Sequence, residues 1–384
     1  GSYNTAVGQS ALTALTTGGQ NTAVGYAAGQ GLTGASNFNV AIGDEVMITS
    51  GEKSNNTAVG SDAMRLTTTG GDNTAVGHIS LAACTTGSHN TAVGRESGTA
   101  ITTGSENTLI GKAAGFSITT GGLNVIIGRS AGKLTTTASN ITAVGKSALQ
   151  NNTTGSESTA VGTGALESNT TAQNTALGFY AGRLNTTGDG NTALGRYALS
   201  SNTDGSNNVA IGTVALQTTT QSYCVAIGVH SQRYAGGNDN TSVGYYTLRT
   251  ATGANNTALG FNSGSSVTSG SNNLLLGNDA GITGSPGGNF TNHSNRVVLG
   301  DENIIELNCQ VSLTVASDQR DKTDFTALDL GLDFVKALAP VTYKWDKRSK
   351  YGDKSAADYD LAAQTPDGTH KEDWLDIGFK AQEV

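Results

Sequence analysis

The sequence predicts an all-β fold, in which a parallel β-solenoid of about 17-residue repeats is followed by a small α+β domain. Three observations predict it: a short motif recurs along residues 1–300, its residues favour strands and turns over helices, and the composition changes near residue 300. Glycine makes up 53 of the 384 residues, without the Gly-X-Y period of collagen. Only 3 prolines and 14% charged residues are present, which excludes a typical disordered chain.

The repeat is a five-residue motif that ends in glycine, and N-T-A-V-G at residues 4–8 is its first copy. Eighteen copies follow one another at spacings of 16 to 18 residues, except for a last step of 23. Their closing glycines are Gly8, Gly25, Gly43, Gly60, Gly77, Gly94, Gly111, Gly128, Gly145, Gly162, Gly178, Gly195, Gly212, Gly228, Gly244, Gly260, Gly277 and Gly300. A helical pair needs more than about 30 residues, so each copy predicts one turn of a β-solenoid.

Each unit is expected to form a strand, a turn, a second short strand and a closing turn. In the T-A-V part the side chains alternate between two faces, so Ala points one way while Thr and Val point the other. The Ala face is expected to be closely approached, because larger residues are rare there. Glycine ends the strand where a Cβ would obstruct the turn. Ser147-Ala148-Leu149 exemplifies the second strand, and T-T-G-S or T-T-G-G supplies the closing turn.

Stacked units would form a thin rod. Neighbouring turns rise by roughly 4.8 Å, so eighteen of them give a length on the order of 85 Å. Such a coil buries little surface per residue, and it is therefore expected to need partner chains. The Asn that opens most motifs is expected to stack as a ladder along the rod, amide to amide.

The C-terminal residues differ from the repeats in charge. Residues 1–300 contain 12 Lys and Arg and 13 Asp and Glu, whereas residues 301–384 contain 10 and 17. This shift, together with local pattern, predicts a repetitive solenoid shaft over 1–300, a strand-rich connector over 301–316 and a separate domain over 317–384. In that domain the apolar spacing predicts an amphipathic helix near residues 328–338, followed by a strand from Val341 to Trp345.

Cofactors, metals, nucleic acids and membrane insertion are not expected. The net charge of −8 argues against a nucleic-acid binder, which would carry a basic stripe. No apolar run reaches 18 residues, so no membrane-spanning helix is predicted. Neither the cysteines nor the histidines have the spacing of metal ligands, and the thiols are expected to be small buried or surface groups. These residues are Cys84, Cys224, Cys309, His78, His89, His230, His293 and His370.

The repeats present two further surface features whose roles stay open. The second motif position is mostly Thr, and a flat Thr ladder would suit ice binding. Apolar residues interrupt this ladder, which favours a buried position instead; they are Val40, Val125, Val209, Val225, Leu274 and Val297. Aromatic residues gather between positions 179 and 261, where they would stack on the sugars of a receptor or, as interface composition favours, pack between chains. The 13 acidic residues of 1–300 show no pairing typical of a glycoside hydrolase.

The N-x-A-[VI]-G repeat resembles the head repeats of trimeric autotransporter adhesins and the shafts of phage tail fibres. The adhesin heads are left-handed parallel β-rolls with three chains in one rod, so the resemblance implies a homotrimer of that handedness. The usual repeat of that family is shorter. The extra residues here fall in the T-T-G-S segment, which predicts a longer outward loop.

Three segments of residues 317–384 resemble the C-terminal intramolecular chaperone domain of phage endosialidases and tail spikes. They are S-D-x-R-x-K from Ser317, G-L-x-x-V-x-x-L-x-P-V-x-Y-x-W from Gly331 and G-F-x-A-Q-E-V from Gly378. In that family the domain trimerises the fibre, helps it to fold and then cuts itself off. The resemblance implies cleavage between Ala316 and Ser317 by a dyad of Ser317 and Lys322. The family domain usually continues past A-Q-E-V, so this copy is expected to be truncated at its C-terminus.

A serine–lysine dyad is chemically sound at these positions. A serine hydroxyl needs a base to act as a nucleophile, and a lysine whose pKa is lowered by burial can serve as that base. Ser317 would attack the carbonyl of Ala316 and form an ester, which water then opens. The alternative role of Ser317 is to cap a helix. Self-cleavage is the one enzymatic activity expected, without turnover of an external substrate.

The sequence therefore predicts a phage tail fibre or tail spike, located in the virion and outside the cell. Its expected partners are two further copies of itself, other tail proteins and a host-surface glycan or protein receptor. A bacterial trimeric surface adhesin with the same chaperone is the alternative, and a solitary ice-binding solenoid is a weaker one. A membrane-tethered transcription factor released by the same chaperone is disfavoured, because no basic DNA-binding segment is present.

Overall fold

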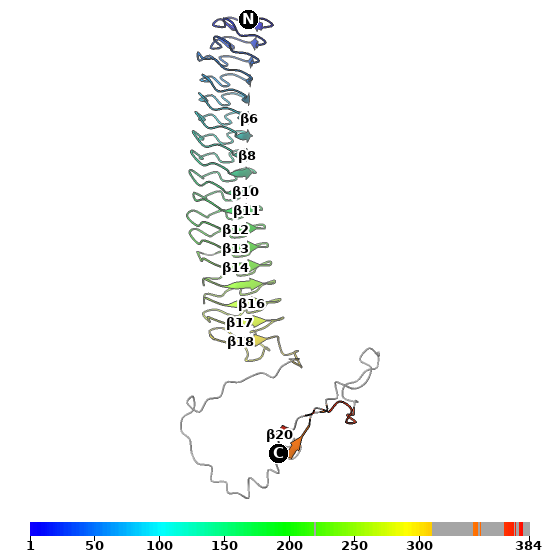
Figure 1. The fold of residues 1–384 in the computed structure, drawn as a ribbon. Helices are drawn as coiled ribbons and strands as arrows, with labels where there is room; N and C mark the ends of the chain where they lie inside the picture. The colour runs from blue at the N-terminus through cyan, green and yellow to red at the C-terminus, as the bar shows by residue number, and fades with distance from the viewer. Residues whose placement is uncertain are drawn as a thin grey trace, which may run out of the picture. The chain divides into compact units, whose positions relative to one another are not determined.

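In a computed structural model of the chain, the residues described are 1–218, 220–308, 341–344, 346, 365–371, 373 and 376–378. The chain divides into two compact units, Gly1–Leu307 and Asn308–Val384. The first unit contains one sheet of 18 parallel strands (Figure 1), and no helix occurs among the described residues. The prediction of an all-β parallel solenoid is confirmed.

The strands of the solenoid are three residues long, and each coincides with one copy of the motif. They are β1 (Thr5–Val7), β2 (Thr22–Val24), β3 (Val40–Ile42), β4 (Thr57–Val59), β5 (Thr74–Val76), β6 (Thr91–Val93), β7 (Thr108–Ile110), β8 (Val125–Ile127), β9 (Thr142–Val144), β10 (Thr159–Val161), β11 (Thr175–Leu177), β12 (Thr192–Leu194), β13 (Val209–Ile211), β14 (Val225–Ile227), β15 (Thr241–Val243), β16 (Thr257–Leu259), β17 (Leu274–Leu276) and β18 (Val297–Leu299). Each strand pairs in register with the strands of the turns before and after it, so equivalent motif positions form straight columns.

The other side of each turn is not a strand, and here the prediction of a second short strand is wrong. Ser147 and Leu149 have φ values of 58° and 50°, and the equivalent residues of most other turns are also left-handed. An extended strand needs φ near −120°, so these residues can form only a chain of tight turns. Neighbouring coils are still hydrogen-bonded on this side, as where the amide of Leu149 donates to the carbonyl of Ala165 at 3.0 Å.

The motif glycine is required by the close approach of successive coils. Gly94 has a φ of +133°, which side-chain-bearing residues rarely adopt. A Cβ placed on it would lie 2.7 Å from the carbonyl carbon of Gly111 in the next coil. The same contact recurs along the column of motif glycines. Each glycine therefore makes room for the next turn of the solenoid.

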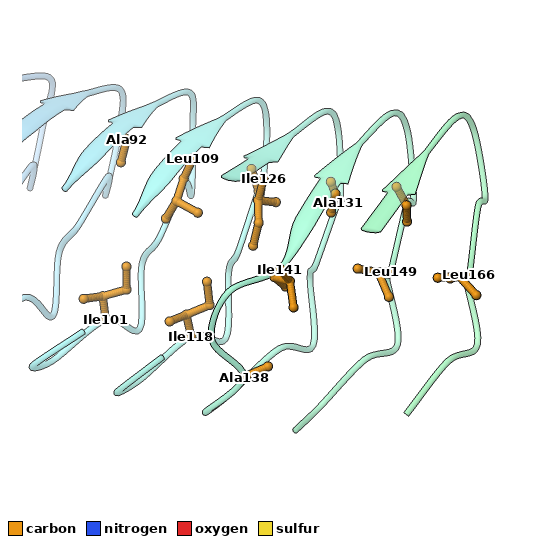
Figure 2. Close-up of a cluster of buried hydrophobic side chains, with 14 of the residues drawn as sticks. Ala92, Ile101, Leu109, Ile118, Ile126, Ala131, Ala138, Ile141, Leu149 and Leu166 are labelled. Carbon is orange, nitrogen blue, oxygen red and sulfur yellow. The ribbon is translucent and has the colours of Figure 1, made fainter. Parts of the chain in front are cut away.

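The interior is filled from two sides, as Figure 2 shows for the central turns. The middle residue of each strand points inward, and Ala92, Leu109 and Ile126 are fully buried there. Ile101 and Ile118 come from the opposite side of the coil and are also fully buried. The prediction that the Ala face is closely approached is confirmed.

Large residues in the Ala column are matched by glycines across the coil. Leu109 and Ile126 replace Ala at the centres of β7 and β8. A Cβ on Gly115 would lie 2.9 Å from a methyl carbon of Leu109, and one on Gly132 would lie 2.8 Å from a methyl carbon of Ile126. Many turns with Ala in the strand carry a buried Leu or Met at this glycine position. In a few turns both positions are small, as for Ala92 and Gly98, and there the side chains of Leu81 and Leu109 from the adjacent turns approach the glycine instead.

The predicted ladder of asparagines is confirmed. In its central part, the side-chain amide of Asn107 donates to Oδ1 of Asn90 at 3.0 Å and to the carbonyl of Gly121 at 3.0 Å. Oδ1 of Asn107 in turn accepts from the backbone N–H of Asn124 at 3.2 Å and from its side-chain amide at 2.9 Å. These buried bonds join successive coils and satisfy polar groups in the interior of the solenoid.

In two turns that lack a ladder asparagine, those of Ile141 and Ser158, a second asparagine takes over one of its bonds. Ile141 stands at a ladder position, and the amide of Asn152 in the same turn donates to the carbonyl of Gly155 at 2.8 Å. A ladder Asn at 141 would be placed to bond that carbonyl, as Asn107 bonds Gly121. Asn169 acts in the same way for the turn of Ser158, donating to the carbonyl of Thr171 at 2.7 Å.

One turn is held by a buried lysine. The side chain of Lys53 is 2% exposed, and its Nζ donates to the carbonyls of Thr49 and Thr67 at 2.7 Å and of Gly31 at 3.3 Å. Burial lowers the pKa of Lys53 to about 8. The three carbonyl acceptors favour the charged ammonium and oppose that shift. Lys53 thus joins three successive coils through one side chain.

Candidate assembly face and cleavage site

The residues of the predicted cleavage site lie outside the described residues. This holds for Ala316, Ser317 and Lys322, and also for the predicted helix near residues 328–338. The described start of the predicted connector, residues 301–308, contains no strand, and its Ile305 is 96% exposed. The dyad therefore remains a prediction from the sequence.

The described part of the second unit brings two of its three motif segments together. β19 (Val341–Tyr343) pairs antiparallel with β20 (Asp376–Gly378), with Val341 opposite Gly378. The strand predicted at Val341 is confirmed. Nearby, a carboxylate oxygen of Asp346 accepts from the backbone N–H of Gly368 at 2.7 Å. The P-V-x-Y segment and the start of G-F-x-A-Q-E-V are therefore neighbours in one small sheet.

The outer face of the solenoid sheet is apolar along its whole length. The second and fourth motif positions point away from the coil, the second mostly Thr or Val and the fourth Val, Ile or Leu. Many of the fourth residues are more than a third exposed: Val7, Val24, Ile42, Val76, Val93, Ile110, Leu177, Leu194, Leu259 and Leu299. The Thr column, expected to be buried, is instead partly or fully exposed in the single chain. A continuous row of exposed apolar side chains of this kind marks a candidate interaction surface.

Aromatic and arginine side chains form a second column, beside the motif glycines of the later turns. The ring of Phe179 lies 5.5 Å from that of Tyr197, and Tyr245 stacks on Phe261 at 5.5 Å. Arg183 lies 4.5 Å above the ring of Tyr180. These side chains support one another, and Phe261 is still 53% exposed. The column is therefore an exposed surface whose rings are held by their neighbours.

His230 and the cysteines of the solenoid are held by packing against neighbouring side chains or by burial. His230 stacks on Tyr246 at 4.8 Å, and burial, with the charges of Arg233 and Arg249, lowers its pKa. Cys84 and Cys224 are buried free thiols. Burial raises the pKa of Cys84 to about 11 and also raises that of Cys224, so both stay protonated and unreactive.

Among the described residues no group of His, Cys, Asp and Glu side chains is arranged to hold a metal ion. In the same part of the chain, no helix has the length and apolar character needed to cross a membrane.

A basic column in the central turns was not predicted from the sequence. Arg95, Lys112, Arg129 and Lys146 each follow a motif glycine in four consecutive turns, and all four are exposed. The signal was present in the sequence, because aligning the repeats on their glycines places these cations in one column. It was missed because the net charge of the whole chain is negative.

Comparison with known proteins identifies the C-terminal domain. Residues 317–384 match the family model described as the chaperone of endosialidase, which confirms the resemblance of the three motif segments. No curated protein and no solved structure matches the chain. The chaperone family implies a trimer, and the solenoid precedes the matched residues in the sequence. Residues 317–384 thus match the endosialidase chaperone family and follow a parallel β-solenoid in the sequence, an order that fits a tail-spike-type protein.

Proposed function

We propose that this protein is the fibre or spike of a phage tail and attaches the virion to the host surface. The observation that carries this proposal is the direct succession of an 18-strand solenoid and an endosialidase chaperone domain in one chain. The solenoid provides reach, with roughly 4.8 Å of length per turn. The chaperone provides assembly. A receptor on the host surface and other tail proteins complete the set of partners.

The apolar outer face of the sheet is the proposed contact between the three shafts. It runs from β1 to β18 without a charged residue in any strand. Packing three such faces around a common axis would bury Thr and Val of the second motif position and Val, Ile and Leu of the fourth. This arrangement explains why apolar residues replace Thr in several turns. It also disfavours ice binding, which needs that column free in water.

The chaperone is proposed to leave the finished fibre by self-cleavage. The hydroxyl of Ser317 would lose its proton to Lys322 and attack the carbonyl carbon of Ala316. The peptide bond then breaks, the amino group of Ser317 takes the proton, and Ala316 is held as an ester. Water would hydrolyse this ester and free the Ala316 carboxylate and the Ser317 hydroxyl. Removal of the chaperone would make assembly irreversible.

Intact and native mass of the protein expressed from its complete gene test both parts of the proposal. The wild type is expected to lose everything from Ser317 onward and to leave a trimeric shaft. Ser317→Ala is expected to stay uncut, whereas Ser312→Ala, five residues upstream, is the matched control and should be cut normally. An uncut wild-type trimer would refute self-cleavage by the dyad but would leave the proposal of a trimeric fibre standing. A stable wild-type monomer would contradict the fibre itself.

Substitution at the outer face tests the trimer contact. Ile110 is 39% exposed at the end of β7, in the middle of the apolar column. Ile110→Asp would place three carboxylates near the common axis, where burial of unpaired charge is costly. Native mass is expected to show loss of trimer, whereas Thr120→Asp, on an exposed turn of the same coil, should leave the trimer intact. A trimer in both variants would show that another face makes the contact.

A trimeric bacterial surface adhesin is the second candidate, because the repeats also resemble adhesin heads. Labelling with an antibody against the shaft separates the two candidates in the electron microscope. A phage fibre would place the label on virion tails, whereas an adhesin would place it on the cell envelope.

A further inference from the structure

The basic column is a local concentration of positive charge in an acidic protein. Arg95, Lys112, Arg129 and Lys146 follow the motif glycines of β6 to β9, and Lys133 lies beside them in the turn of β8. Neighbouring coils are about 4.8 Å apart, so the four column cations span about 14 Å along the rod. Five of the 12 Lys and Arg residues of positions 1–300 are gathered here, although the chain carries a net charge of −8.

Most of these cations lack an acidic partner. Arg95 pairs with Glu96 at 2.6 Å. Lys112, Arg129, Lys133 and Lys146 take part in no ion pair among the described residues. Within about a Debye length, unpaired charges in a row add to one positive field, which attracts an anionic ligand.

A hollow in the surface lies on this column. Its volume is about 440 Å³, within the range of small-ligand sites. This hollow, here called the basic hollow, is lined among others by Lys112, Arg129, Lys133, Phe116, Glu96 and Ser130. A second hollow of about 300 Å³ shares the side chain of Ile79 with it. The depression therefore continues along the rod beyond one turn.

The charge pattern limits how long a bound anion can be. Toward the N-terminus the same side of the coil carries Asp44, Glu45 and Asp62, of which Glu45 and Asp62 pair with Arg65. Toward the C-terminus Thr163 takes the column position after Lys146. A long nucleic acid would extend over the acidic turns, whereas a short stretch of an acidic glycan fits between these limits.

We propose that the basic hollow binds a linear acidic polysaccharide, which names the receptor class of the attachment function proposed above and rests on it. The ammonium and guanidinium groups of Lys112, Arg129 and Lys133 would bind carboxylate or sulfate groups of the chain. The ring of Phe116 gives the apolar face of a sugar a surface on which to pack. Glu96 and Ser130 supply oxygens that accept hydrogen bonds from sugar hydroxyls.

Binding of defined polysaccharides to the full chain tests this inference. The probes are polygalacturonate for carboxylate, dextran sulfate for sulfate, unmodified dextran as the neutral control and single-stranded oligothymidine as a polyanion of another class. The wild type is expected to bind an acidic polysaccharide in preference to the other two probes, and the tighter of the two acidic probes identifies the anion.

Variants locate the binding in the hollow. Lys112→Gln combined with Arg129→Gln is expected to weaken binding about tenfold or more, because two charge-assisted contacts are lost. Phe116→Leu, which keeps the apolar packing without the ring, is expected to weaken it severalfold. Arg196→Gln removes an exposed cation at the same position of a later turn and should leave the affinity unchanged.

Three results would overturn the inference: no binding of either acidic polysaccharide, an equal loss in Arg196→Gln, or tighter binding of oligothymidine. Native mass of the same samples separates this inference from the proposed function. A wild-type trimer that binds no polysaccharide refutes only the basic hollow. A wild-type monomer refutes the fibre.

Discussion

Replacing one asparagine of the ladder should open the solenoid locally, and a second substitution should repair it. Asn107→Ile removes the donor to the carbonyl of Gly121 and the acceptor of the Asn124 backbone N–H. Both groups are buried and have no other hydrogen-bond partner in the structure. A buried polar group left without a partner costs about 1–3 kcal/mol, so the expected loss is about 2–6 kcal/mol.

The repair copies an arrangement found two turns later. There Ile141 stands in the ladder, and Asn152 donates to the carbonyl of Gly155 at 2.8 Å. Ile118 occupies the position of Asn152 in the turn of Asn107. Adding Ile118→Asn should therefore supply a new donor to Gly121 and restore about 1–3 kcal/mol relative to the sum of the single substitutions.

Hydrogen exchange followed by mass spectrometry is the appropriate assay, because repeat proteins open locally and a single unfolding free energy is not well defined for them. Amides in the coils of β7 and β8 should exchange about thirtyfold faster or more in Asn107→Ile. Amides near β15 serve as the internal reference, and Thr137→Ala, on an exposed turn, serves as the control variant. If the double variant loses as much protection as the two single variants added together, the proposed replacement of the Asn107 hydrogen bond by one from position 118 is refuted.

Two further predictions concern the core. Leu109→Ala is expected to destabilise the coil of β7 by about 2–5 kcal/mol through the cavity it leaves, and Gly115→Leu should recover part of that loss while being harmful alone; local hydrogen exchange of the three variants measures this. Lys53 has a folded pKa of about 8, below its unfolded value of 10.5. The unfolded chain therefore binds more protons between these values, and stability is expected to rise as pH increases from 8 to 10.5. Hydrogen exchange of the amides in the coils that Lys53 joins, corrected for the intrinsic pH dependence of exchange, measures the rise, which should vanish in Lys53→Met. An equal rise in that variant would assign it to other groups.

Much of the solenoid could be predicted because the same residue types occupy the same positions of the repeat in most of its eighteen copies. The motif glycines, the inward Ala and the ladder asparagines recur at fixed spacing. The glycines and asparagines proved to lie where two coils approach, and the Ala is buried in the interior. The second strand could not be recognised as turns, because Ser147 and Leu149 are not residues that signal a left-handed backbone. Their conformation is imposed by the short coil and by the packing of Leu149 inside it.

Features that occur in only one or a few turns could not be predicted from the repeat. Lys53 stands where other units carry Gly, and nothing in its neighbours shows that its ammonium reaches three carbonyls inside the coil. The pairing of large strand residues with glycines also needs the three-dimensional register, since Leu109 and Gly115 lie six residues apart and meet only because the chain turns back. The cleavage site depends on motif resemblance, and Ser317 and Lys322 lie outside the described residues.

The division between fixed and free positions explains how one repeat can carry several surfaces. A change at Gly94 or at a ladder Asn disturbs both adjacent coils, because each of these residues contacts the next turn directly. A change of the side chain directly after the motif glycine disturbs neither, since that side chain is exposed and the residue's bond to the next coil is made by its backbone carbonyl, as from Lys112 to the N–H of Ser130. The same column accordingly holds cations from Arg95 to Lys146 and aromatic rings from Phe179 to Phe261 over an unaltered coil. Exchanging residues in this column should therefore change what the shaft binds while its stability and trimeric state persist.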